Sequence, residues 1–366
     1  MLSFSKIKVV FIYIFFIFIS LFALLNLQNE ENTVLNKKVN LGLDLQGGSY
    51  LLLEIDTDPL IKERIQSKVV PLKKLLNKNG FSYTNFIISS NKISLNFNNK
   101  DIQKFEKIFF SEKDNLLNSY IPKYNSFELD FKLIDNSIEI FFSKFGILNI
   151  NNLALSQSIE IVRRRIDDTG TKEPTILQRG DKRILVELPG IKDPERIKNL
   201  LGKTAQLNFR LVSDEKSEFG FDELISEEGE KLIVNKRIIF SGENLVDAQP
   251  RMDNQNNQPI VSFTLDRLGA QKFGRATTDN VGKRLAIVLD GEIVSAPNIN
   301  EPITSGNGMI SGNFTFQEAT DLALLLRSGA LPTPLNVVEE RTVGPDLGED
   351  SIKSGVTSLI VGFILV

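Results

Sequence analysis

Apolar and polar positions between residues 50 and 212 follow the order strand, helix, strand, strand, helix, strand, and this order occurs twice. The first round predicts strands at 50–56, 83–89, 92–97 and 127–134, with helices at 59–79 and 102–120. The second predicts strands at 137–142, 174–178, 183–188 and 207–212, with helices at 152–167 and 193–202. This βαββαβ order is that of the ferredoxin-like fold. Pro71 interrupts the first helix of the first round, so the second round fits the fold better.

A different pattern follows in residues 213–328, which we expect to form an α+β head domain inserted into this base. The charged stretch 214–231 lacks periodicity and predicts a loop or linker. The rest predicts strands at 260–265, 285–289 and 293–295, a hairpin turn at Asp290-Gly291, and a helix at 315–327 that begins with a Thr315/Glu318 capping box. Because residues 335–343 return to strand-like sequence, we expect the chain to rejoin the base there.

Apolar segments lie near both ends of the chain. Residues 9–25 carry no charge and would span about 25 Å as a helix, which predicts a membrane anchor. Lys6 and Lys8 precede this segment, so we expect a cytoplasmic N-terminus and a periplasmic location beyond about residue 30. A cleaved signal peptide is the alternative, although Ala23-Leu24-Leu25 is not a typical cleavage site. Residues 356–366 predict a second membrane helix that is cut short, and hence a fragment of a polytopic protein.

Composition and charge exclude several kinds of chemistry. The net charge of -3 argues against nucleic acid as a partner, because phosphate binding needs a surplus of basic residues. The chain has no Cys and no His, which excludes thiolate nucleophiles, Ser-His-Asp catalysis and the usual zinc ligands. We therefore expect no enzyme activity, no metal and no cofactor.

Two short motifs have a structural interpretation. In the segment Gly42–Gly48 (GLDLQGG), the glycines lead into a strand and not into a helix, so a turn or bulge is favoured over a phosphate loop. Asp44 and Gln46 would satisfy backbone groups in that turn. The three arginines 163–165 point in different directions on a helix, which favours a solvated face, with Arg164 free to pair with a carboxylate.

Six segments, in this order along the chain, resemble motifs of the SecD family of protein-export subunits, which is related to SecF within the RND superfamily. They are Gly42–Gly48, Arg163–Pro174, Val186–Gly190, Ile293–Pro297, Arg327–Pro332 and Val343–Gly348. The motif residues that we expect to be structural are Asp44, Gln46, Gly47, Gly48, Arg164, Asp167, Gly170, Pro174, Pro189, Gly190, Pro297, Pro332, Gly344 and Pro345. Residues 59–135, here called the extension, carry none of these motifs.

The resemblance implies a subunit of the inner membrane that pairs with SecF, associates with the SecYEG channel and helps to pull an unfolded preprotein across with the proton gradient. It also implies a head that swings on a hinge. Val212, Ser213, Gly329 and Pro332 border the predicted head and are our hinge candidates. We expect the preprotein to contact residues 238–327, in a groove or at an exposed sheet edge. Proton conduction would need ionisable groups in later membrane helices, which lie outside this sequence.

These expectations divide the chain into a cytoplasmic tip with the first membrane helix (1–28), the first base strands (29–58), the extension as an additional βαββαβ module (59–135), the ferredoxin-like base (136–212), the head (213–328), a return to the base (329–350) and a truncated membrane helix (351–366). Three other functions stay open. They are a membrane-anchored periplasmic scaffold or chaperone without energy coupling, a proton-driven RND-type exporter, and a carboxylate-based hydrolase.

Overall fold

The computed structural model describes residues 6–24, 47–97, 101–112, 115–134, 137–169, 174–191, 193–213, 220–226, 229–253 and 256–365. They belong to two units, Gly48–Thr342 and the combination of Met1–Gly47 with Val343–Val366. The second unit contains helices α1 (Lys6–Leu24) and α9 (Pro345–Leu365). Among the described residues, no helix has both the length and the apolar character that a membrane crossing requires. The two predicted membrane helices are therefore not confirmed.

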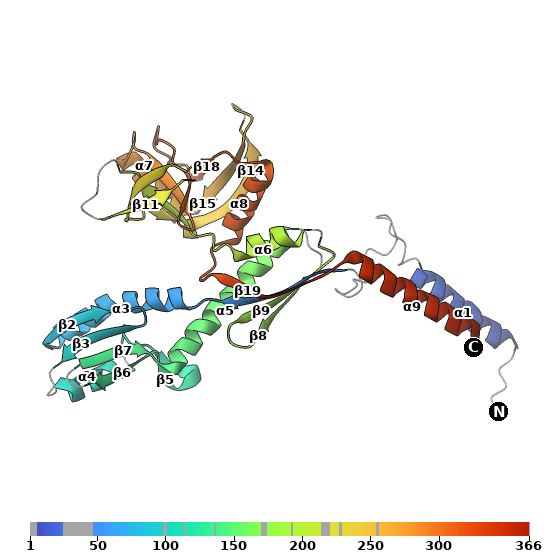
Figure 1. The fold of residues 1–366 in the computed structure, drawn as a ribbon, viewed down its shortest axis with the longest axis horizontal. Helices are drawn as coiled ribbons and strands as arrows, with labels where there is room; N and C mark the ends of the chain where they lie inside the picture. Colours follow the sequence, from blue (N-terminus) through green and yellow to red (C-terminus); the bar gives the residue numbers. More distant parts are fainter. Residues whose placement is uncertain are drawn as a thin grey trace. The chain divides into compact units, whose positions relative to one another are not determined.

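A four-stranded sheet with two helices forms the base domain (Figure 1). Its elements are β1 (Gly48–Ile55), α5 (Lys144–Asp168), β8 (Thr175–Arg179), β9 (Arg183–Pro189), α6 (Pro194–Gly202) and β19 (Leu335–Val343). In space the strands lie in the order β19-β1-β9-β8. Along the chain they follow the order βαββαβ, and each helix connects two strands that are separated by one other strand. This is the expected ferredoxin-like topology.

Alternation along the central strands builds the core of the base. Leu51, Leu53 and Ile55 of β1 are buried, and β1 pairs with β9 in antiparallel register, with Leu51 opposite Val186. Successive strand residues point to opposite faces, so these side chains share one side of the sheet. There they join the buried face of α5, whose apolar residues recur at helical spacing.

Two predicted base strands belong to other sheets, and these predictions were wrong. Strand β7 (Ser137–Phe142) pairs with β3 and β6 of the extension, and β10 (Leu207–Leu211) pairs with β13 and β16 of the head. The base takes its first strand from residues 48–55 and its last from residues 335–343, both within segments that the predicted domain division gave to the base. Alternation identifies a half-buried strand but does not identify its partner. Our assumption that neighbours in sequence pair with each other fails where two insertions interrupt one module.

The extension, predicted at 59–135, covers residues 58–142 in the structure, because β7 belongs to its sheet, with strand order β2-β3-β7-β6; the name covers 58–142 from here on. Its main elements are α3 (Asp58–Lys78), β2 (Tyr83–Ile88), β3 (Lys92–Phe97), α4 (Ile102–Phe109), β6 (Leu129–Ile134) and β7, with a short β4–β5 pair (Tyr120–Ile121, Ser126–Phe127). The predicted βαββαβ order is wrong here, because β1 belongs to the base.

Two helix predictions in the extension also need correction. Helix α3 continues through Pro71, because its buried face, with Leu72 and Leu76 fully covered, offsets the hydrogen bond that proline cannot make. Helix α4 ends at Phe109 and not near residue 120. Its last carbonyl groups accept hydrogen bonds from the side chains of Asn115 and Asn118, which end the helix.

The described part of the head contains two larger sheets and two α-helices around a main apolar core, and a second, smaller apolar cluster includes Leu232, Val234 and Ile293. Its elements are β10, β11 (Phe221–Ile225), β12 (Lys231–Asn235), β13 (Phe240–Ser241), β14 (Leu245–Met252), β15 (Pro259–Leu265), α7 (Arg267–Asp279), β16 (Leu285–Leu289), β17 (Glu292–Ser295), β18 (Asn307–Ser311) and α8 (Phe316–Ser328). The sheet orders are β13-β10-β16-β17 and β14-β15-β18.

Several predictions for the head are confirmed. Asp290 and Gly291 form the turn between β16 and β17 with φ of 52° and 90°, and the Thr315/Glu318 capping box opens α8. The loop predicted at 214–231 is wrong in part, because residues 221–225 form a hairpin with β12. Helix α7 was not predicted, because most of its residues are polar and its buried face, around Phe273 and Thr277, is narrow.

Candidate functional site

Two connections join the head to the base, and one buried arginine lies between them. The chain leaves α6 through residues 203–206 to enter β10, and it returns from α8 through residues 329–334 to β19. Arg165, on α5 of the base, is only 1% exposed. Its side chain donates hydrogen bonds to the carbonyl oxygens of Leu200, Lys203, Thr204 and Gly329 and to the hydroxyl of Ser328.

The surroundings of Arg165 explain how a cation can be buried there. The hydrogen bond from Nη1 to the Leu200 oxygen measures 2.7 Å, and those from Nη2 to the oxygens of Thr204 and Gly329 measure 3.3 Å. The carbonyl groups at the ends of α6 and α8 lack partners within their helices and carry partial negative charge, so they suit a guanidinium. Burial lowers the pKa of Arg165 to about 10, an effect that the charge of Asp290 partly opposes. Arg165 therefore stays cationic at neutral pH.

Asp290 holds the same connection from the head side. Its carboxylate accepts hydrogen bonds from the Thr204 hydroxyl and from the backbone N–H groups of Ala205 (2.9 Å) and Gln206 (2.8 Å). The N–H of Leu331 donates to the Thr204 oxygen at 2.8 Å, which links the two connections directly. The turn predicted at Asp290 thus has a second role, which its glycine signature did not reveal.

Both connections contain a residue with an unusual backbone conformation. Ala205 has φ of 60°, and Gly329 has φ of 92° with ψ of 166°. For alanine, this left-handed region costs about 1–3 kcal/mol and persists only where the surroundings hold it in place. Hydrogen bonds from Arg165 on one side and Asp290 on the other supply such surroundings.

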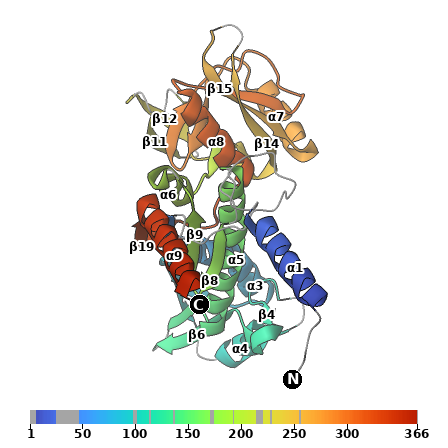
Figure 2. The ribbon, with the colours of Figure 1, turned by 90° about the vertical axis from the view of Figure 1, so that its right-hand side faces the viewer.

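Helix α8 packs against both domains (Figure 2). Leu324 and Leu325 lie in the base core, whereas Ala319, Leu322 and Ala323 lie in the head core. Two ion pairs connect α8 to the base helices. They are Arg196–Asp321 at 2.6 Å and Arg327–Asp168 at 2.9 Å.

A cavity of about 550 Å³ opens in the head beside α7. Apolar side chains contribute to its lining, and Ile238 and Leu268 are 44% and 55% exposed. Three cationic side chains and one carboxylate also line it, namely Arg237, Lys272, Arg275 and Asp279. This groove combines an apolar surface with a positive charge.

Two of the four predicted hinge residues lie inside the head sheets, and the other two lie in the second connection. The N–H of Val212 donates to the Arg284 oxygen (3.0 Å), and the N–H of Ser213 donates to the Ile233 oxygen (2.9 Å), so both lie inside the paired strands of the head. The predicted border at 212–213 is therefore wrong, because β10 already belongs to the head and the connection lies at 203–206. Gly329 and Pro332 lie in the second connection, as predicted.

The motif residues occupy several places. Gly47 and Gly48 have φ of 68° and 136°, and Gly48 pairs with Pro189, which Gly190 (φ 67°) follows. The two glycine motifs thus lie together at one end of the base sheet. Asp44, Gln46 and Gly170 lie outside the described residues.

The remaining motif residues make separate contacts. Arg164 is exposed and pairs with Glu160, as predicted. Asp167 lies exposed on α5, and Pro174 directly precedes β8. The carbonyl oxygen of Pro297 accepts a hydrogen bond from the N–H of Leu285. Gly344 precedes Pro345, the first residue of α9.

Sequence reasoning missed Arg165, the buried residue that donates hydrogen bonds at both connections. We treated the three arginines as one solvated face. Arg165 lies three residues after Val162 and four after Ile161, both of which are buried. Helical spacing therefore places it on the apolar face of α5, and this signal was available in the sequence.

Comparison with known proteins agrees with this arrangement. Three family models match the chain: the SecD/SecF GG motif at residues 34–59, the N-terminal part of the P1 domain of protein translocase subunit SecDF at 155–214, and the SecDF P1 head subdomain at 217–333. SecD of Rickettsia prowazekii is 39% identical over 100% of this chain and 71% of its own length. The chain belongs to the SecD family.

Other SecD relatives match over a similar span. SecD of Rickettsia bellii is 42% identical over 90% of this chain and 63% of its own length, and SecD of Acetobacter pasteurianus is 43% identical over 90% and 64%. The chain thus spans between 63% and 71% of the length of these SecD proteins. A crystal structure of SecDF in its super-membrane-facing form superposes with a TM-score of 0.51 at 28% identity and covers 96% of this chain and 38% of that one.

Proposed function

We propose that this chain is the substrate-handling part of a SecD-type translocase subunit, whose head binds an unfolded preprotein during export. Membership of the SecD family supports a role in protein export, and the relatives are named protein translocase subunits. The observation that carries the proposal is the groove beside α7, because it lies in the part that matches the P1 head subdomain.

The chemistry of the groove suits an extended polypeptide. An unfolded chain exposes apolar side chains that a folded protein buries, and Ile238 and Leu268 offer an exposed apolar surface for them. The cationic side chains around this surface favour segments that carry carboxylates. Such a surface would bind many sequences weakly, as a translocation substrate requires.

Export further requires a membrane context and an energy source. We propose that the subunit resides in the bacterial inner membrane with this region in the periplasm, pairs with SecF and works beside SecYEG. We also propose that the proton gradient drives the head through groups in the part of SecD relatives that this chain does not span. Support for these proposals comes from family membership.

Site-specific photocrosslinking tests the substrate role. A crosslinker would replace Leu268 or Ile238 in the full-length subunit, and vesicles would hold a stalled secretory polypeptide. The matched control is a crosslinker at Gln178, an exposed residue of the base strand β8. We expect polypeptide crosslinks from the groove and none from Gln178. The absence of crosslinks from every tested position between residues 238 and 327 would exclude the head as the substrate surface.

A second measurement separates an export motor from a scaffold or chaperone. In a motor, collapse of the proton gradient changes where along the stalled polypeptide the groove crosslinks. In a passive scaffold, the crosslinked positions stay the same.

Charge reversal at Lys272 and Arg275 should weaken crosslinking to acidic segments more than to neutral segments.

A further inference from the structure

We propose that Arg165 is a positioning residue that fixes the orientation of the head on the base. The partly exposed ion pairs between α8 and the base helices, here called the outer pairs, support the same orientation more weakly. The proposal rests on the proposed function in one respect, since it concerns the domain that we expect to bind substrate. The structural part can be tested without any substrate.

The first step of the argument is that Arg165 holds both connections at once. Its acceptors lie between 35 and 164 positions away in sequence. On the way into the head, the acceptors are Leu200 in the last turn of α6 and Lys203 and Thr204 in the first connection. On the way back, they are Ser328, the last residue of α8, and Gly329 in the second connection. The planar guanidinium offers five donors in a fixed geometry, which is what two separate groups of acceptors require.

The second step is that residues 204–206 are held from both domains. Arg165 contacts Thr204 from the base, whereas Asp290 contacts Thr204, Ala205 and Gln206 from the head. The Asp290 turn is part of the head sheet, so it moves with the head. A change in head orientation must therefore break the hydrogen bonds on the Arg165 side. Release there would also let Ala205 leave its left-handed conformation.

The third step concerns the ion pairs. Arg196–Asp321 and Arg327–Asp168 connect α8 with α6 and α5, and both are partly exposed. Exposed ion pairs of this kind contribute little individually. The buried Arg165 contributes more, because its removal takes a hydrogen bond from five acceptor oxygens at once. The outer pairs can therefore open first, and Arg165 decides whether the head leaves the base.

Hydrogen exchange on the full chain tests this order of events, because exchange reports even rare open states. The reporters are the amides of Ala205 and Leu331, which donate to Asp290 and Thr204. In Arg165→Met we expect exchange of the peptides around these amides to accelerate by roughly tenfold or more, with the extension unchanged. The matched control is Arg164→Met, because Arg164 is exposed and pairs with Glu160 on its own helix. It should leave exchange unchanged.

Spin-label distances show whether opening also changes the orientation of the head. The chain has no Cys, so Gln157→Cys on α5 and Ser311→Cys on β18 give one base–head distance. We expect a second distance population in Arg165→Met, and a single population in Arg196→Asp, because Arg165 still holds the head when the outer pair is broken. A single unchanged distance with unchanged exchange in Arg165→Met would overturn the proposal.

A folding defect would be recognised by loss of protection throughout the base. In that case Arg165→Lys decides, because it keeps the charge but cannot reach both groups of acceptors. It should accelerate exchange in the two connections alone, and unchanged exchange there would overturn the proposal. Crosslinking separates this proposal from the proposed function. If the distance and exchange change in Arg165→Met while the head gives no polypeptide crosslinks, the proposed function fails and the positioning role stands. If crosslinks form while distance and exchange are unchanged, the positioning role fails.

Discussion

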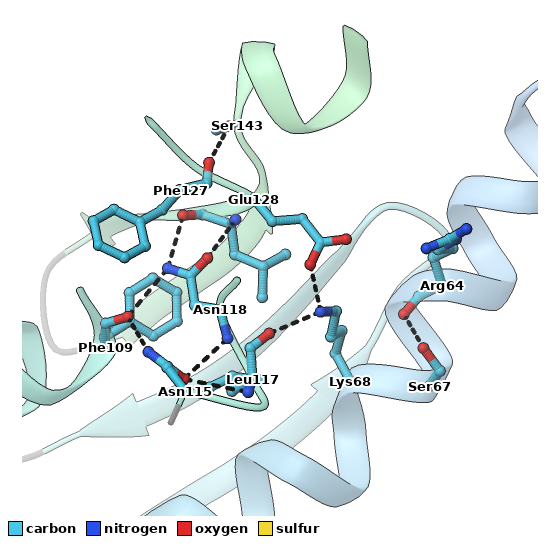
Figure 3. A network of polar contacts seen from close by, with 11 residues as sticks. Arg64, Ser67, Lys68, Phe109, Asn115, Leu117, Asn118, Phe127, Glu128 and Ser143 are labelled. Atoms are coloured by element: carbon cyan, nitrogen blue, oxygen red, sulfur yellow. Dashed lines mark hydrogen bonds and ion pairs between the residues drawn. The ribbon is translucent and has the colours of Figure 1, made fainter. Parts of the chain in front are cut away.

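The extension holds a half-buried cation and the base–head junction a fully buried one, and the two are satisfied differently. In the extension, the Lys68 ammonium donates to the Glu128 carboxylate at 2.6 Å and to the Leu117 oxygen at 2.9 Å (Figure 3). Asn118 lies in the same network and bonds the backbone of Phe109 and Leu129. Every partner belongs to the extension. At the junction, the described acceptors of Arg165 are four carbonyl oxygens and one hydroxyl, and they belong to chain segments that lead into and out of another domain.

This difference separates stability from position. A cation paired with a carboxylate inside one module stays satisfied wherever the module moves, so Lys68 stabilises the extension alone. The hydrogen bonds of Arg165 exist only while both connections lie against α5. A cation shielded from water needs partners in either place. The partners of Lys68 stabilise a single module, whereas those of Arg165 favour one orientation of the head on the base.

The largest loss of stability is expected from a substitution in the aromatic core of the extension. Phe105 is fully buried and packs against the rings of Phe81, Phe109 and Phe131, with centroids 5.2–6.0 Å away. Phe105→Ala should lower the free energy of unfolding of the extension by about 3–5 kcal/mol, measured by hydrogen exchange of its strands. Leu116→Ala, at a side chain that is 88% exposed, is the control and should have almost no effect. Faster exchange at Ala205 in Phe105→Ala would contradict the independence of the two regions.

A smaller effect should follow from breaking the ion pair of the extension. Lys68→Met leaves the Glu128 carboxylate almost buried without its partner, and should destabilise the extension by about 2–4 kcal/mol. The double variant Lys68→Met with Glu128→Leu should regain most of this loss, because it removes both charges together. Hydrogen exchange of β6 and β7 gives both values. If the double variant is as unstable as the sum of the single variants, the pair does not act as one unit.

The features that the sequence predicted correctly are those determined by residues adjacent in the chain. The hairpin turn at Asp290-Gly291, the capping box at Thr315 and Glu318, and most strand positions follow from local geometry and are confirmed. It did not predict which sheet a strand joins, as 137–142 and 207–211 show, because alternation carries no information about the partner. The ferredoxin-like topology was nevertheless correct, although it is assembled from different strands.

The candidate site was predicted less well than the fold. Gly329 was identified because glycine at a domain border is recognisable in sequence. The spacing of Arg165 from Ile161 and Val162 indicates that it is buried, but its role was missed because its acceptors lie far away in the chain, at Leu200 and Gly329 among others. The role of Asp290 was missed for the same reason. Residues that bridge domains are thus the hardest to predict from one sequence, because neither partner is visible near the other.

The smallest effect concerns a charge at the surface of the head, whose partners are local, as they are in the extension. Asp266 precedes α7 and accepts a hydrogen bond from the backbone N–H of Gly269, which together with the Asn244 amide keeps the pKa of Asp266 below its ordinary value of 3.8. A lowered pKa means that this carboxylate stabilises the folded head fully above pH 3.8 and loses that contribution as the pH falls through its lower native pKa. Asp266→Asn keeps an acceptor oxygen but lacks the charge, so wild type should melt at a higher temperature than the variant at pH 6, and the difference should disappear at low pH. Glu301→Gln, at an exposed loop position, is the control and should show no such difference. A difference for Asp266→Asn that persists below the native pKa would mean that the cap acts through shape and not through charge.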